Sequence, residues 1–146
     1  MLQTKTLYDQ DFNLWIDAQR AALNEQRYDD LDLSNLLEEL DGLTRRDKRA
    51  LKSHLRVLLT HLLKWQYQKQ KRTTSWQLSI DNSRLEVADI LDDSPSLRNY
   101  MSEVFASCYQ VARKQASKET QTFIDTFPAH CPYSLESVLK DDAYPE

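Results

Sequence analysis

The sequence predicts an all-α fold, a bundle of five or six helices around a long central helix at about 44–68, with a C-terminal strap. Three observations predict it. Gly42 is the only glycine in 146 residues, which excludes Gly-rich phosphate-binding loops and disfavours two-residue β-hairpins. Leu, Glu, Lys, Gln and Arg, all good helix formers, are frequent. Leucines in the middle of the chain recur at helical spacing.

The N-terminal part predicts two helices. Apolar residues recur at helical spacing from Tyr8 to about Gln26, which indicates one amphipathic helix whose start Asp9 or Asp11 can cap. After an acidic connection, Leu33–Leu40 should form a short helix. We expect Gly42 to end it in the left-handed conformation, which glycine adopts at little cost.

The central helix is expected from Thr44 to Gln68. Its apolar stripe is wide, because Leu59 and Leu63 lie beside the main row. A wide stripe predicts neighbours on more than one side. The main row consists of Leu51, Leu55, Leu58, Leu62 and Trp65.

Two further helices and a strap complete the prediction. Ser75 should cap a helix that ends near Asp92, and the next helix should run from Leu97 to about Thr120. The tail is too apolar for a free segment, so we expect it to strap onto the bundle, with Ser134 capping a short final helix. Its apolar residues are Phe123, Ile124, Phe127 and Tyr133. Without a linker or a repeat, residues 1–146 should form one domain.

Composition narrows the functional classes. No apolar run approaches the ~18 residues of a membrane span, and no signal-peptide core is visible. We therefore expect a cytoplasmic protein with no membrane contact, whose Cys108 and Cys131 are reduced thiols. Net charge is −4, yet residues 48–80 contain eight basic and no acidic residues. Such an uneven charge attracts an anionic partner, or places a basic helix beside acidic ones.

Several segments resemble one bacterial family. "YDQDFNLW" (8–15), "LLEEL" (36–40), "LLTHLLKWQYQ" (58–68), "DSPSLR" (93–98) and "CPYSLESVL" (131–139) occur in the order and at the spacing typical of it. The chain is identified as a member of the domain of unknown function 29 family, which is frequent in cyanobacteria. The resemblance covers nearly the whole length and implies an all-helical bundle. It implies no activity and no catalytic residues.

Two histidines on the central helix are the candidates for chemistry. Arg49-x4-His54 and Arg56-x4-His61 fit the Arg-x4-6-His arrangement of HEPN-type ribonucleases, in which histidine acts as acid or base and arginine stabilises phosphate charge. Five residues rotate a helix by about 140°, so we expect Arg56 and His61 to face one way only with a dimer partner. The simpler interpretation is that His61 is half-buried and bonded to a carboxylate such as Glu38 or Glu39. No HExxH motif is present, and we expect no metal and no cofactor.

The basic segment offers binding candidates, Lys64, Lys69, Lys71 and Arg72. With Trp65, Tyr67 and Trp76 they are typical of a surface that stacks bases and pairs with phosphates. The alternative is structural: the tryptophans belong to the core and the cations complement a helix C-terminus.

The functional hypothesis is a non-enzymatic protein that binds another macromolecule, most simply a protein, through the strap or an acidic face. The alternative is a metal-independent, dimeric ribonuclease of the HEPN type with Arg56 and His61, or a nucleic-acid-binding module that uses residues 48–80. A homodimer is compatible with either hypothesis.

Overall fold

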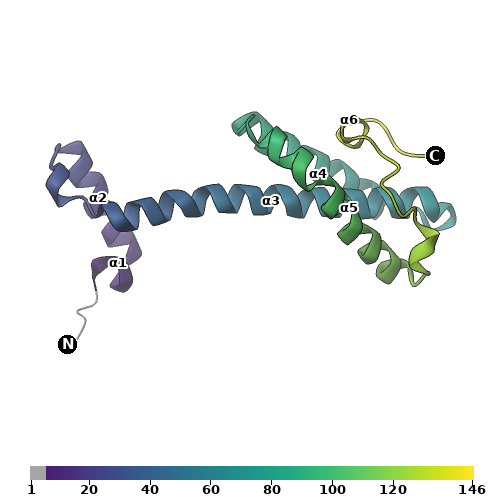
Figure 1. Cartoon of the computed structure of the whole chain (residues 1–146), viewed down its shortest axis with the longest axis horizontal. Coiled ribbons are helices and arrows are strands. Elements are labelled where there is room, and N and C mark those ends of the chain that lie inside the picture. Colours follow the sequence, from purple (N-terminus) through teal and green to yellow (C-terminus); the bar gives the residue numbers. More distant parts are fainter. Residues whose placement is uncertain (1–5) are drawn as a thin grey trace. The chain divides into compact units, whose positions relative to one another are not determined.

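The computed structural model describes residues 6–146, and these residues form helices, turns and irregular segments without a β-strand. The predicted all-α fold with a long central helix is confirmed (Figure 1). By contacts, the chain divides into two compact units, one ending at Arg45 (unit 1) and one spanning Arg46–Glu146 (unit 2). The expectation of a single domain stays a prediction, and each unit is described by itself.

Unit 1 contains α1 (Leu7–Gln10), α2 (Phe12–Asn24), the 3-10 turn η1 (Tyr28–Asp30) and the beginning of α3 (Leu33–Tyr67). The single helix predicted over 8–26 is interrupted at Asp11, whose backbone is extended. Its carboxylate accepts a hydrogen bond from the Leu14 amide at 3.1 Å, so Asp11 ends α1 and caps α2. Of the two candidate caps Asp9 and Asp11, the structure uses Asp11, and the short helix α1 precedes it.

The small core of unit 1 centres on Trp15. Its ring is buried, and its indole Nε1 donates to the Asp32 carboxylate at 3.0 Å. The rings of Tyr8 and Phe12 pack on it, with centroids 4.7 and 5.6 Å away. The Tyr8 hydroxyl donates to Glu39 at 2.5 Å. Ala22 is the other buried apolar residue among residues 6–45.

Gly42 does not end a helix, which corrects the sequence-based boundary. One helix, α3, runs without interruption from Leu33 to Tyr67, and Gly42 is not at positive φ. Its neighbours Leu40, Leu43 and Arg45 are good helix formers, so the ~1 kcal/mol that glycine costs in a helix is tolerated. The short helix at 33–40 and the central helix at 44–68 are therefore one element.

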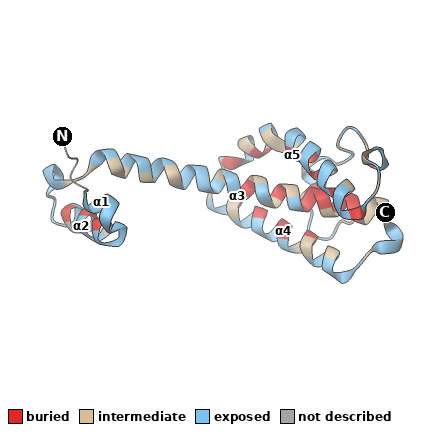
Figure 2. Cartoon of the chain, turned by 90° about the horizontal axis from the view of Figure 1, so that it is seen from below, coloured by how far each residue is buried: buried red, intermediate tan, exposed pale blue. Residues whose placement is uncertain are grey.

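The core of unit 2 is built on the second half of α3. Figure 2 shows buried residues along this part of α3 and on the facing sides of α4 (Thr74–Asp93) and α5 (Leu97–Thr120). The predicted leucine row is confirmed, since its leucines and the two beside it are at most 1% exposed. Side chains from α4 and α5 complete the cluster, among them Ile80, Val87, Met101, Cys108, Tyr109 and Ala112. Burial on several sides explains why the apolar stripe had to be wide.

Side-chain caps mark the beginnings of α4 and α6, at or within two residues of the predicted caps. Thr73, not Ser75, caps α4, because its hydroxyl accepts from the Trp76 amide at 3.2 Å. Ser134 caps α6 (Leu135–Val138), as predicted, by accepting from the Ser137 amide at 3.1 Å. Two further 3-10 turns, η2 (Lys69–Lys71) and η3 (Ile124–Thr126), follow α3 and α5.

The segment 121–146 is the predicted strap, and it is held by its backbone. Because most of it is irregular, its carbonyls need donors from elsewhere. Tyr109 donates to the Pro128 carbonyl at 2.5 Å, and Arg113 donates to the Phe127 carbonyl at 3.0 Å. The strap's own Phe127 and Val138 side chains are buried in the core. Phe123 is 89% exposed and does not pack as predicted, because it lies in the turn that leaves α5.

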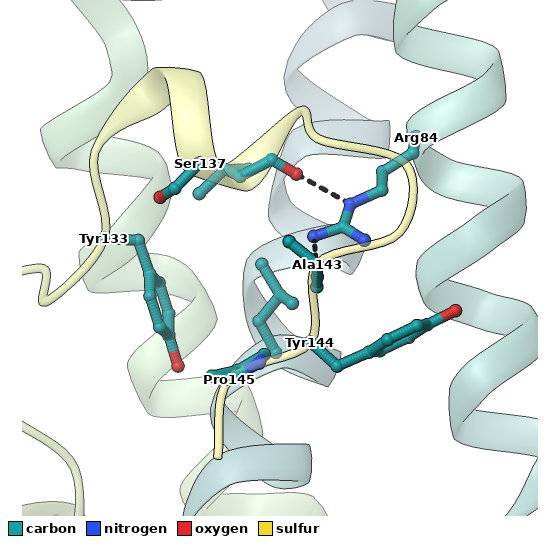
Figure 3. Close-up of a pocket in the computed structure, with 8 residues that line it drawn as sticks. Arg84, Tyr133, Ser137, Ala143, Tyr144 and Pro145 are labelled. Carbon is teal, nitrogen blue, oxygen red and sulfur yellow. Dashed lines mark hydrogen bonds between the residues drawn. The ribbon is translucent and has the colours of Figure 1, made fainter.

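Arg84 of α4 is a further anchor of the strap, and its side chain is buried. Its Nε donates to the Val138 carbonyl at 2.8 Å and its Nη2 to the Ala143 carbonyl at 2.6 Å, as Figure 3 shows. The Tyr144 ring lies over the guanidinium, 5.6 Å away. Together with Tyr133 and Leu62 these groups line an apolar cavity of about 180 Å³. The cavity lies between α3, α4 and the strap, and Arg84 closes it with backbone hydrogen bonds.

Gly42→Ala should stabilise the protein by about 0.5–1 kcal/mol, because alanine is the better residue inside a helix. An added Cβ would meet only the Arg45 guanidinium, at 4.0 Å. Urea unfolding followed by far-ultraviolet circular dichroism measures the change. Destabilisation of about 1 kcal/mol would instead indicate the left-handed stop that the sequence predicted.

Candidate functional site

Lys64, a predicted binding residue, is buried in the fold. Its ammonium lies 3.9 Å from the Glu119 carboxylate of α5 and 4.6 Å from the centre of the Trp76 ring. Both contacts are typical of a charge that is neutralised internally. Lys64 therefore ties α3 to α4 and α5 and is not presented to a partner.

Arg72 is also used internally. Its guanidinium lies 4.7 Å from the centre of the Trp65 ring. Its Nε donates to the Trp65 carbonyl at 2.8 Å, near the end of α3, and its Nη2 donates to the Pro145 carbonyl of the strap at 3.3 Å. The predicted cation at a helix C-terminus is thus present, and it also anchors the strap.

The remaining predicted binding residues, Lys69 and Lys71, are exposed on η2. Trp65 and Trp76, expected in the core, are only half-buried. Arg72 lies over the Trp65 ring, and Lys64 lies over the Trp76 ring. Lys69 and Lys71 are therefore the exposed cations of this segment. The cations that lie over the two tryptophan rings take up ring surface on which a base would stack.

Arg56 and His61 line one groove between α3 and α5. The groove has a volume of about 280 Å³, and Gln115 and Glu119 of α5 form its other wall. We expected the two α3 residues to face one way only in a dimer. A single chain brings them together because the groove follows several turns of α3 and the long arginine side chain reaches it.

The environment of His61 fixes its proton. Its Nδ1 lies 2.9 Å from the Val57 carbonyl oxygen. Because a carbonyl can only accept, Nδ1 carries the proton and donates it, and Nε2 is the unprotonated nitrogen of the neutral ring. Burial is the main cause that lowers the pKa of His61 below its ordinary value of 6.5, and Lys64 adds to it. The predicted carboxylate partner is wrong: Glu39 bonds Tyr8 in unit 1 instead.

The other histidine pattern is not part of this groove. His54 lies 3.9 Å from the Glu86 carboxylate of α4, so Arg49 and His54 do not line the cavity of Arg56 and His61. Among residues 6–146, no three His, Cys, Asp or Glu side chains converge in a way that could hold a metal ion. Cys108 is buried and Cys131 half-buried, and both are free thiols.

Unit 1 carries an exposed apolar surface that sequence reasoning did not single out. Three leucines at i, i+4 and i+7 of α3, Leu33, Leu37 and Leu40, are each about 60% exposed. We call these three residues the leucine face. The sequence predicted a short helix over Leu33–Leu40 and assigned no exposed apolar side to it. Other large apolar side chains exposed in unit 1 are Leu7, Phe12, Leu14, Leu23, Tyr28 and Leu43.

The surroundings of the leucine face are acidic. Residues 1–45 contain ten acidic and four basic residues. Two arginines of unit 1 are paired with local carboxylates: Arg45 lies 3.4 Å from Glu38, and Arg27 lies 2.6 Å from Asp30. A surplus of negative charge therefore remains on unit 1.

The fold is that of a small all-helical protein with a C-terminal strap that packs on α4 and α5. A comparison with known families matches residues 7–144 to the family described as "Domain of unknown function DUF29". The chain belongs to this family, as its sequence segments indicated. Comparisons with curated proteins and with solved structures found no match. In the part of the chain that the structure describes, no helix is both long and apolar enough to cross a membrane.

Acidification should destabilise the protein partly through His61. The unfolded chain binds a proton at an ordinary histidine pKa of 6.5, and the folded chain binds it only at lower pH. Stability from this group is therefore complete above about 6.5 and is lost as the pH falls toward the lowered folded pKa. Titration of the His61 ring resonances by NMR should give a midpoint below 6.5. A midpoint above 6.5 would contradict the buried, neutral imidazole.

Proposed function

We propose that this protein is a non-enzymatic docking protein that binds another protein through unit 1. The observation that carries the proposal is the mismatch between exposed and buried apolar residues there. Trp15 and Ala22 are its only buried apolar residues within 6–45, whereas nine large apolar side chains are exposed. Exposed apolar surface of this density marks an interaction site in soluble proteins.

The leucine face is the proposed anchor. Side chains at i, i+4 and i+7 form one stripe along a helix, the arrangement by which a helix packs on another helix or in a groove. Full burial of a leucine contributes about 1.5–3 kcal/mol, so the three leucines would offset a substantial part of the cost of association.

The acidic surplus of unit 1 defines the chemistry of the partner. We propose a partner protein with an apolar patch flanked by lysine or arginine, since complementary charge speeds association and excludes acidic partners. The strap, the other predicted contact, is less suited to this role. Its Val138 and Pro128 carbonyls already accept hydrogen bonds from α4 and α5, and its Phe127 and Val138 side chains are buried. A cytoplasmic setting is part of the proposal and stays a prediction.

The test uses the full chain and a partner captured with it, identified and then purified. Leu33→Gln/Leu37→Gln/Leu40→Gln should weaken binding at least tenfold, because the anchor is removed from exposed positions without touching the core. Leu78→Gln/Leu85→Gln is the matched control, since both leucines are more than half exposed on α4. Binding should also weaken as salt rises.

Two results would overturn this proposal. One is a partner whose affinity is the same for the triple variant and the α4 control. The other is a chain that self-associates through the leucine face in sedimentation experiments, which would make a second copy the occupant.

A ribonuclease is the second candidate, favoured by one observation, the shared groove of Arg56 and His61. A neutral His61 with a free Nε2 has the form that a general base needs. The purified chain should then cleave single-stranded RNA in the presence of a chelator, and His61→Ala should abolish cleavage while circular dichroism remains that of the wild type. Cleavage that persists in the variant would show a contaminating nuclease.

A further inference from the structure

The groove between α3 and α5 combines one cationic side chain with side chains that accept hydrogen bonds. Arg56 and His61 come from α3, and Gln115 and Glu119 come from α5. Val57 and Val111 add apolar surface to the two walls. Its volume of about 280 Å³ is near the lower end of the range for small-ligand sites.

The charge of Arg56 has no counter-ion in the fold. No carboxylate among residues 6–146 lies within ion-pair distance of its guanidinium, in contrast to Lys64, which is paired with Glu119. Its Nε is buried and has no hydrogen-bond partner, and its other near neighbour is the thiol of Cys108. A buried donor without a partner is unfavourable. An anion in the groove would supply the missing counter-ion, and guanidinium groups bind phosphate in a bidentate way.

Two other groups of the groove, His61 and Glu119, accept hydrogen bonds. His61 uses its Nδ1–H on the Val57 carbonyl, so its Nε2 presents a lone pair. The Glu119 carboxylate is held 3.9 Å from Lys64 and also accepts. These acceptors would repel a bare phosphate but would bind a hydroxyl group, which donates. A ligand that satisfies both walls therefore carries a phosphate and a hydroxyl close together.

We propose that this groove binds a ribose phosphate, with the phosphate on Arg56 and a ribose hydroxyl on His61 or Glu119. The same chemistry is found in a free ribonucleotide and in the backbone of single-stranded RNA. The site is independent of the docking role of unit 1, and it requires binding but no cleavage.

The test is an NMR titration of the full chain with adenosine 3′-monophosphate, followed through the resonances of the groove. We expect saturable binding that Arg56→Ala weakens at least tenfold. Arg56→Lys should lie in between, because lysine keeps the charge and loses the bidentate geometry. It also keeps the test valid if the alanine variant unfolds. Arg49→Ala is the matched control, since this arginine is exposed on the same helix and lines no part of the groove.

The hydroxyl is tested with the 2′-deoxy analogue. It should bind about tenfold more weakly, and this preference should disappear in His61→Gln/Glu119→Gln. Oligomers of single-stranded RNA and DNA distinguish the two sources: binding of RNA without binding of the nucleotide would assign the groove to a strand, provided that it too depends on Arg56. Shifts that do not saturate, or equal losses in Arg49→Ala and Arg56→Ala, would overturn the proposal.

Discussion

Unit 2 depends on one constraint, the burial of the leucines in the second half of α3. Leu51, Leu55 and Leu58 are 0% exposed, so α4, α5 and the strap must enclose this part of the helix. The irregular strap can do so only because Arg84, Arg113 and Tyr109 donate to its carbonyls. Of the four cations that the sequence assigned to a binding surface, Lys64 and Arg72 also have partners within the fold, whereas Lys69 and Lys71 are exposed.

The first part of α3 belongs to unit 1, and its leucines are exposed instead of buried. The leucine face has the same helical spacing as the buried row, yet nothing among residues 6–45 covers it. A unit of this size with Trp15 and Ala22 as its buried apolar residues has little hydrophobic stabilisation of its own. A partner that covers the leucine face would therefore stabilise the unit as well as bind it.

The sequence predicted what local chemistry determines and missed what long-range contacts determine. The wide leucine row, the Ser134 cap and the strap follow from periodicity and capping, and the structure confirms them. Gly42 was misassigned because glycine is a common stop, whereas the helix-forming residues around it carry α3 through. The burial of Lys64 and the groove of Arg56 and His61 depend on α5, some 50 residues further along the chain, and no local pattern contains that information.

The central claim is that the two units differ in stability because they differ in burial. Native-state hydrogen exchange, measured residue by residue on the free full chain, tests it most directly. The account predicts that amides of α2 exchange through openings of only a few kcal/mol, far below the free energy that protects Leu55–Leu63. Equal protection of α2 and of this part of α3 would contradict the account, because unit 1 would then be as stable as unit 2 without a partner.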